Sequence, residues 1–252
     1  MNLPKAVAVI GYKNTGKTQV VEALVRELTA RGYRLGTIKH TLEDAPLDTP
    51  GKDTWRHMKA GAGSTAILSE NSTAFFHRKS FKVSDALKYL GEIDFLVFEG
   101  FKTLKTVSRI IVIDKPSDVD LINGLEIALI PNHLKIETTK DIPLIPIEQI
   151  EKLSDLVEKK AFPLLQGYNC GKCGFESCFA LGKAIVHGET TFSKCFYSTD
   201  KEVNLKVNGE KIPLNKYVKE VFKAVLIGLT GTLKTESPPK KIDVSIGLDK
   251  NE

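Results

Sequence analysis

The stretch Gly11-Tyr12-Lys13-Asn14-Thr15-Gly16-Lys17-Thr18 decides how the first part of this 252-residue chain folds. It fits the phosphate-binding P-loop pattern, in which a glycine and four free positions are followed by Gly-Lys-Ser/Thr. The apolar run at 6–10 is typical of a buried strand, and apolar residues at helical spacing follow the loop from Val20 to Leu28. Gly32 stands where a glycine that ends a helix is expected. The sequence therefore predicts a strand, a phosphate loop and a helix in succession.

The residue types of this loop suit a polyphosphate. Gly11 and Gly16 would let the backbone approach an anion closely, because no Cβ stands in the way. The amide groups of the loop and the start of the following helix would then face the phosphates. Lys17 would reach the β- and γ-phosphates, also as a catalytic residue, and the Thr18 hydroxyl would face Mg²⁺. The nucleotide-binding residues predicted in the loop are Gly11, Asn14, Thr15, Gly16, Lys17 and Thr18.

An acid follows the next strongly apolar run. The run 95–98 predicts a central parallel strand, and Glu99 comes directly after it. P-loop proteins place the carboxylate that holds or orients Mg²⁺ at this position, and the usual residue there is Asp. A glutamate would reach the metal through water or would polarise the attacking water. The alternative is an acid that ends a strand in solvent.

The remaining pattern of the first 160 residues alternates between strands and helices. This alternation favours an α/β fold with a mainly parallel sheet that is covered on both faces. We assign 1–160 to one P-loop nucleotide-binding domain, in which Asp53 and Ser84 are expected to cap helices. Further strands are expected at 34–38, 64–68, 73–76, 110–113, 127–130 and 143–145, and further helices at 54–60, 85–90 and 147–160.

All the cysteines of the chain lie in one segment, 161–198. They are Cys170, Cys173, Cys178 and Cys195. Cysteines clustered in this way in a cytoplasmic chain bind metal more often than they form disulfides. Zinc sites usually use two separated pairs, whereas here three cysteines crowd together and one follows from afar. The spacing therefore favours an iron–sulfur cluster of the 4Fe-4S type, with structural zinc as the alternative.

The residues 199–252 are expected to form a small α/β unit with a docking role. Asn208-Gly209 between two short apolar runs is a strong hairpin signal. An amphipathic helix is expected to start after Asn215, and alternating apolar residues at 242–248 predict one more strand that joins the hairpin.

Composition narrows the class of protein. The formal net charge is +5 and 42% of the residues are hydrophobic, which is ordinary for a globular protein. No apolar run approaches the roughly 20 residues of a membrane span, so we expect no membrane insertion. The N-terminus runs directly into the first strand, so we expect no signal peptide and a cytoplasmic protein. The chain has no arginine-rich stretch interleaved with aromatic residues, so we expect no nucleic-acid partner.

Five strings in the first 150 residues together carry a resemblance to a known family. They are the loop 11–18, Thr-Ile-Lys-His at 37–40, Asp-Thr-Pro-Gly-Lys-Asp-Thr-Trp-Arg at 48–56, Ala-Gly-Ala at 60–62 and Phe-Glu-Gly-Phe-Lys at 98–102. Together they resemble the molybdopterin-guanine dinucleotide biosynthesis protein B family. The resemblance implies a GTP-binding P-loop protein with weak GTPase activity, which assists nucleotide attachment to molybdopterin in molybdenum or tungsten cofactor biosynthesis. It implies molybdopterin guanylyltransferase or molybdoenzyme maturation proteins as partners and favours a homodimer, and it places Lys39 and Asp53 near the phosphates.

The chain departs from related patterns at three places. It has no Asn-Lys-x-Asp string to read guanine, so the choice of base rests on the resemblance. Tyr12 stands where related dimeric ATPases carry a signature lysine, so activation by that lysine across a dimer is not supported. The cysteine segment resembles a small iron–sulfur module of several anaerobe proteins, with Phe196 where a proline often follows the last cysteine.

Two other functions are compatible with the same residues. A P-loop phosphotransferase that acts on a small substrate would use the same loop but would need an acceptor site and a positioned base, for which the sequence names no residues. A redox-sensing module, in which the cluster controls nucleotide-dependent binding of a partner, would use both the loop and the cysteines.

Overall fold

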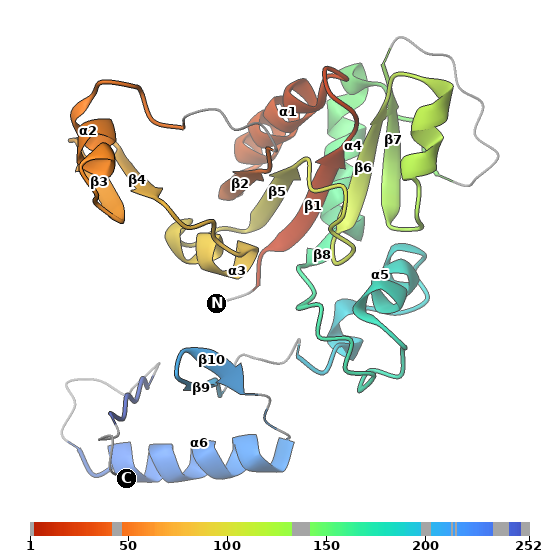
Figure 1. Cartoon of the computed structure of the whole chain (residues 1–252). Coiled ribbons are helices and arrows are strands. Elements are labelled where there is room, and N and C mark those ends of the chain that lie inside the picture. Colours follow the sequence, from red (N-terminus) through yellow and green to blue (C-terminus); the bar gives the residue numbers. More distant parts are fainter. Residues whose placement is uncertain are drawn as a thin grey trace. The chain divides into compact units, whose positions relative to one another are not determined.

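The computed structural model describes residues 3–41, 47–132, 142–197, 203–212, 214, 216–233 and 242–247. The chain divides into two compact units, Met1–Cys195 and Phe196–Glu252, and each is described by itself (Figure 1). The sequence-based division into 1–160, 161–198 and 199–252 stays a prediction.

A six-stranded sheet forms the centre of the first unit. Its order is β2-β5-β1-β6-β7 with parallel neighbours, and β8 pairs antiparallel with the first residues of β1. The strands are β1 (Lys5–Ile10), β2 (Leu35–Lys39), β5 (Phe95–Glu99), β6 (Ser108–Ile113), β7 (Glu126–Pro131) and β8 (Phe162–Pro163). Because β1, β5, β6 and β7 are almost entirely buried, their apolar runs are those of strands covered on both faces of the sheet. The predicted α/β fold with a mainly parallel sheet is confirmed.

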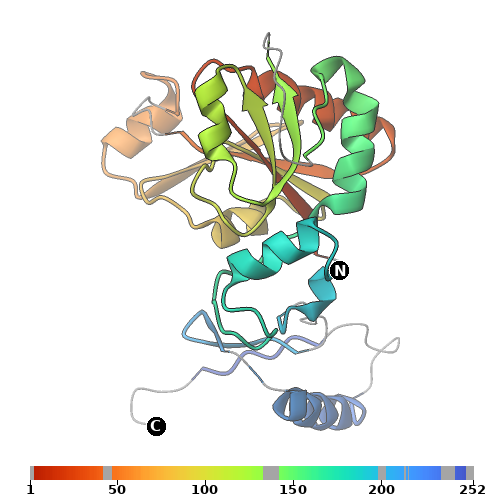
Figure 2. The ribbon, with the colours of Figure 1, turned by 90° about the vertical axis from the view of Figure 1, so that its right-hand side faces the viewer.

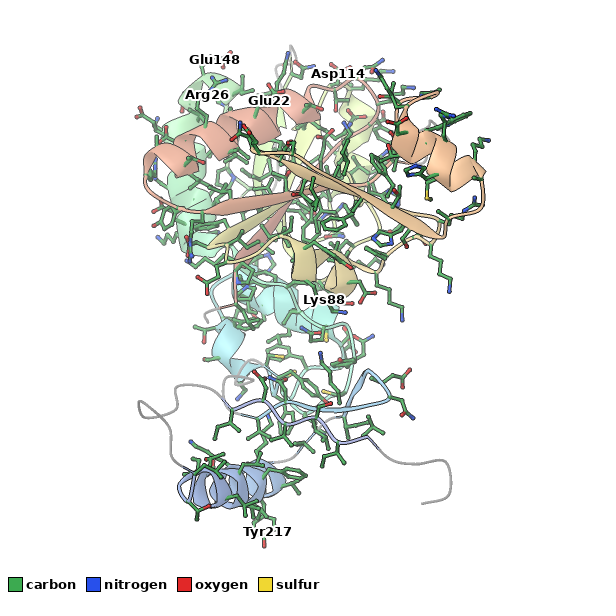
Figure 3. The ribbon with its side chains drawn as sticks, turned by 90° about the vertical axis from the view of Figure 1, so that its left-hand side faces the viewer. Glu22, Arg26, Lys88, Asp114, Glu148 and Tyr217 are labelled. Carbon is green, nitrogen blue, oxygen red and sulfur yellow. The ribbon has the colours of Figure 1, made fainter. Side chains whose placement is uncertain are left out.

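Helices cover the sheet (Figures 1 and 2). The helix α1 (Lys17–Ala30) contacts β1, β5 and α4 (Ile150–Lys160), and its inner side is apolar, whereas Glu22 and Arg26 point outward (Figure 3). The helix α3 (Val83–Ala86) packs on the buried cluster that includes Ala8, Leu96 and Phe98. The 3₁₀ turns are η1 (Leu87–Tyr89), η2 (Pro116–Leu121), η3 (Ile147–Gln149) and η4 (Phe192–Lys194).

A separate two-stranded sheet lies between β2 and α3 in the chain. Its strands β3 (Ser64–Leu68) and β4 (Thr73–His77) pair antiparallel, as expected, and α2 (Asp53–Lys59) precedes them. The predicted caps are wrong, because α2 and α3 start one or two residues earlier and follow extended lysines without a side-chain cap. Asp53 is instead an acid in the first turn, where it interacts favourably with the helix dipole.

The expected strand at 143–145 is also wrong. Only Leu144 pairs with the sheet, in an isolated bridge to Leu129. Pro143 is the first residue of this stretch and Pro146 follows it, and a proline has no N–H to donate to a neighbouring strand.

The second unit contains a hairpin and a helix. The strands β9 (Leu205–Val207) and β10 (Glu210–Ile212) pair antiparallel, and Asn208 and Gly209 both have positive φ, as a tight hairpin turn requires. The hairpin and the helix α6 (Lys216–Thr230) are confirmed. Asn215 and Leu248 lie outside the described residues.

The expected last strand is wrong over its described part, 242–247, which belongs to no strand. Val244 and Ile246 are 57% and 78% exposed, so the alternating apolar side chains have no buried face to occupy. Among the described helices, none has the length and apolar character that a bilayer crossing requires.

Candidate functional site

The phosphate loop lies at the carboxyl end of β1 and leads directly into α1. Asn14 and Gly16 have φ of 63° and 86°, in the left-handed region that lets the chain turn sharply before the helix. A Cβ on Gly11 would lie 2.6 Å from the Thr15 hydroxyl oxygen and 3.0 Å from the Val112 carbonyl oxygen. The close packing at this position therefore requires glycine, and the loop has the strand–loop–helix context that its sequence predicted.

The lysine of the loop lies among other cations. Its Nζ donates to the Tyr12 carbonyl oxygen, which also accepts a 3.0 Å hydrogen bond from the Thr15 hydroxyl. Burial lowers the pKa of Lys17 below its ordinary value; the Glu99 carboxylate opposes this change, and the Lys102 and Lys39 ammonium groups add to it. An anion bound here would offset both the burial and the repulsion between the lysines.

The structure brings Thr18, Lys39 and Glu99 together at the carboxyl edge of the sheet. The Thr18 hydroxyl donates to Glu99 Oε1 at 2.8 Å, and Lys39 Nζ lies 2.9 Å from the same oxygen. Glu99 is only 9% exposed, so the alternative of a strand-ending acid in solvent is wrong. Carboxylate and hydroxyl oxygens are ligands that Mg²⁺ prefers, so Thr18 and Glu99 fit this metal.

A further lysine reaches the loop from the turn after β5. Gly100 and Phe101 both have positive φ, 87° and 56°, and the Phe101 ring is held 5.0 Å from the rings of His40 and Phe98. The turn brings Lys102 Nζ to 3.7 Å from the centre of the Tyr12 ring. Lys102 was not predicted as a site residue, although it belongs to the same string as Glu99, the acid that ends β5.

Asp53 is not brought to this group. Its side chain is 88% exposed and lies 3.8 Å from Arg56 on the same helix. Figure 1 shows α2, with β3 and β4, set apart from the loop between β1 and α1. The role of Asp53 in nucleotide binding stays a prediction.

The cysteine segment is attached at the other end of the sheet. β8 pairs with Lys5 and Ala6 at the start of β1, and the Leu165 amide then donates to the Thr106 carbonyl at 3.0 Å. The helix α5 (Cys178–Val186) packs closely, because a Cβ on Gly182 would lie 3.0 Å from a Leu125 methyl group. The segment is therefore part of the first unit, next to the amino ends of β1, β6 and β7.

The four cysteines differ in exposure. Cys170 is exposed, Cys173 and Cys178 are half-buried and Cys195 is buried, and none is in a disulfide. Gly171 and Gly174 have positive φ and turn the chain between them. All four cysteines are among the described residues. Nowhere in the described residues do three or more Cys, His, Asp or Glu side chains lie close enough together to hold a metal ion. Four thiols are nevertheless the donor set of a 4Fe-4S cluster or of structural zinc, so the residue types fit either group.

Comparison with known proteins identifies the family. The family model described as "Molybdopterin guanine dinucleotide synthesis protein B", MobB, matches residues 6–128. An Escherichia coli protein named "Molybdopterin-guanine dinucleotide biosynthesis adapter protein" is 30% identical over 161 residues, which cover 60% of this chain and 90% of that protein. The chain belongs to the MobB family. This confirms the resemblance drawn from the sequence.

The MobB likeness extends beyond the P-loop region. A Methanocaldococcus jannaschii protein named "Putative molybdopterin-guanine dinucleotide biosynthesis adapter protein" is 29% identical over 251 residues, which cover 98% of this chain and 99% of that protein. A second family model, described as "Putative Fe-S cluster", matches residues 165–197, which contain all four cysteines. The crystal structure of Bacillus subtilis MobB aligns with a TM-score of 0.52 at 23% identity over 60% of this chain and 97% of that one. This last likeness supports the MobB fold, a P-loop α/β fold.

Proposed function

We propose that this chain binds GTP with Mg²⁺ at its P-loop, hydrolyses it weakly and acts as an adapter in molybdopterin-guanine dinucleotide biosynthesis. The relatives named as adapter proteins of that pathway support the biological role. The observation that carries the nucleotide site is the group formed by Thr18, Lys39 and Glu99 beside the phosphate loop. Its partners would be a molybdopterin guanylyltransferase or a molybdoenzyme maturation protein.

Each residue of the group has a separate task. The loop amides and Lys17 would bind the phosphates, and Lys39 would neutralise charge on the terminal phosphate. Thr18 and Glu99 would hold Mg²⁺, directly or through water. When bound, the metal would neutralise the charge that develops on the phosphate oxygens. Because the hydroxyl and the carboxylate are already hydrogen-bonded, little rearrangement is needed to present both.

The cysteine segment would carry an iron–sulfur cluster on Cys170, Cys173, Cys178 and Cys195. These are the four thiols of the chain, and all of them lie within the segment that the second family model matches. A cluster would supply a redox-active centre at this end of the unit.

Equilibrium titration with Mg·GTP tests the nucleotide site. We expect Lys17→Ala to lower the affinity about 100-fold, because a half-buried ammonium that would contact phosphate is lost. Lys88→Ala removes the same charge from an exposed lysine that pairs with Asp85 and serves as the control. Equal affinities of wild type and Lys17→Ala would refute the nucleotide site.

A second function, control of nucleotide binding by the state of the cluster, is favoured by the segment 100–107. This segment starts directly after Glu99. Its Lys102 contacts the Tyr12 ring of the phosphate loop, and its Thr106 carbonyl oxygen accepts a hydrogen bond from the Leu165 amide of the cysteine segment. Lys105 Nζ lies 5.4 Å from the ring of Phe179, next to Cys178. Nucleotide affinity measured on cluster-loaded and cluster-free protein tests this function, since linkage requires that the two affinities differ.

A further inference from the structure

Two polar side chains at the carboxyl edge of the sheet have no task in the group described above. Asp114 follows β6 and Asn132 follows β7, and both are half-buried. The Asn132 side-chain amide donates to Asp114 Oδ1 at 3.0 Å, and the Asn132 backbone N–H donates to the Ile113 carbonyl at 2.7 Å. Ligands of open α/β sheets bind along this edge.

The position of this pair relative to the phosphate loop fits the length of a nucleotide. Gly11 packs against the Val112 carbonyl, two residues before Asp114, and Figure 3 shows Asp114 near the amino end of α1, where the loop leads into that helix. Neighbouring strands are about 4.8 Å apart, so the end of β7 lies about 10 Å from the end of β1. The base, the ribose and the first phosphate of a nucleotide together span a distance of this order.

The direction is also determined by the group around Glu99. Glu99 and Lys39 end β5 and β2, on one side of β1 in the sheet, whereas β6 and β7 lie on the other side. If the metal and the terminal phosphate face Glu99, the nucleoside extends from the loop toward β6 and β7. Asp114 and Asn132 end those two strands.

The backbone under Asp114 is fixed by a buried carboxylate. Asp118 is 2% exposed, and its Oδ2 accepts from the amides of Asp114 and Lys115 at 2.8 and 3.1 Å. The backbone N–H groups of Asp114 and Asn132 are thus both hydrogen-bonded, which limits the reorganisation that ligand binding would require.

The chemistry of the pair discriminates between bases. An ionised carboxylate only accepts hydrogen bonds, and guanine presents two donors, N1–H and the 2-amino group, on one edge. Adenine presents an acceptor at N1, which would face the carboxylate unfavourably. The side-chain amide of Asn132 can donate to O6 or N7 of guanine, both acceptors.

We propose that Asp114 and Asn132 bind the base of the nucleotide and select guanine over adenine. This inference rests on the proposed nucleotide site and concerns the base, which the P-loop does not bind.

Titration of wild type and Asp114→Asn with the Mg²⁺ complexes of GTP, ATP and xanthosine triphosphate tests the proposal. We expect wild type to bind GTP at least about 10-fold more tightly than ATP, because the half-buried carboxylate would face the N1 acceptor of adenine in place of the two donors of guanine. Asp114→Asn should bind GTP about 10- to 100-fold more weakly and should gain affinity for xanthosine triphosphate, whose 2-carbonyl accepts from the new amide. Such a gain cannot come from misfolding. Asp120→Asn, an exposed residue of η2, is the matched control.

A second variant tests the other member of the pair. Asn132→Ala should bring the ratio of GTP to ATP affinity close to one, with ATP binding retained. An unchanged preference in both variants, or equal affinity of wild type for GTP and ATP, would overturn the proposal and leave the nucleotide site in place. A wild-type protein that binds none of the three nucleotides would overturn the proposed function as well.

Discussion

The phosphate loop and the cysteine segment lie at opposite ends of the same sheet and differ in how far the polypeptide alone assembles them. In the loop region, the Thr18 hydroxyl and the Lys39 ammonium group both lie at hydrogen-bonding distance from one carboxylate oxygen of Glu99. In the cysteine segment, which is described at all four thiols, the side chains do not gather into a metal-binding group. The parallel sheet fixes the groups beside the phosphate loop, whereas two of the four cysteines, Cys170 and Cys173, lie in a loop whose glycines have positive φ.

The difference indicates two ways of making a site. Hydrogen bonds between protein groups hold the loop region in place, and a ligand would replace those bonds one by one. The ligands of a metal site are usually not held by hydrogen bonds to one another, and the free energy of metal binding itself orders them. We therefore expect the nucleotide site to survive changes that abolish the metal site.

The largest expected effect concerns the cluster. Cys173→Ser removes one of four thiolate ligands and should abolish most of the iron and sulfide bound by anaerobically purified protein, because a hydroxyl is a poor cluster ligand. Hydrogen exchange should then accelerate within 165–195 but not in β1. Lys172→Ala, at the neighbouring position, should retain its iron. Full iron content in Cys173→Ser would exclude this residue as a ligand, and zinc without iron or sulfide in wild type would establish the alternative metal.

The next effect concerns the region where the segment meets the sheet. Arg109 is 2% exposed; burial lowers its pKa, and its Nη1 lies 3.6 Å from Glu126 Oε1. Glu126 also accepts from the amides of Asn123 and Gly124 at 3.0 and 2.7 Å. Glu126→Ala should lower the free energy of unfolding by about 3–5 kcal/mol, because a buried charge loses its partner.

Urea denaturation followed by circular dichroism measures this change. The control is Glu92→Ala, which breaks an exposed ion pair with Arg34 and should shift the midpoint far less. Similar shifts in the two variants would mean that the Arg109–Glu126 pair contributes no more than a surface pair.

A smaller effect is expected at the metal side of the loop. Glu99→Gln keeps the shape of the side chain and removes its charge, so the Mg²⁺ concentration needed for half-maximal nucleotide binding should rise about 10- to 100-fold. Lys39→Ala should change the Mg²⁺ requirement less, since this lysine is largely exposed. If Glu99→Gln left the Mg²⁺ requirement unchanged, the carboxylate would serve only to hold Thr18 and Lys39.

The smallest effect is expected for Asp53. Because its side chain is exposed and contacts only its own helix among the described partners, Asp53→Ala should change Mg·GTP affinity less than about threefold. A loss of 10-fold or more would show that α2 moves to the phosphates when nucleotide binds, in agreement with the place that the family resemblance gives to this residue.

The parts of the fold that follow from local sequence were predicted well. The phosphate loop, the buried strands and the Asn208-Gly209 hairpin each depend on residues that are adjacent in the chain. The errors arose where a local pattern lacked a tertiary partner: the alternation at 242–247 has no surface to cover, and two prolines limit pairing at 143–145.

Only the site residues that belong to local sequence motifs could be predicted. Lys17, Thr18 and Glu99 could be named because their positions relative to strands and loop glycines carry the signal. The approach of Lys102 to Tyr12, the Asp114–Asn132 hydrogen bond and the buried Arg109–Glu126 pair join residues from different strands, so only the folded structure shows them. Whether the cysteines bind iron or zinc depends on the metal supplied and on the reducing environment as well as on their spacing.

The strand β1 sets the separation between the two ends of this unit. It has six residues, or about 20 Å, with the antiparallel pair to β8 at its first residues and the phosphate loop after its last. A triphosphate at one end would therefore be too far from iron at the other for any atom of the two to touch. The nucleotide and the cluster would therefore not react with one another directly. A change at one site would affect the other through a displacement of the polypeptide between them.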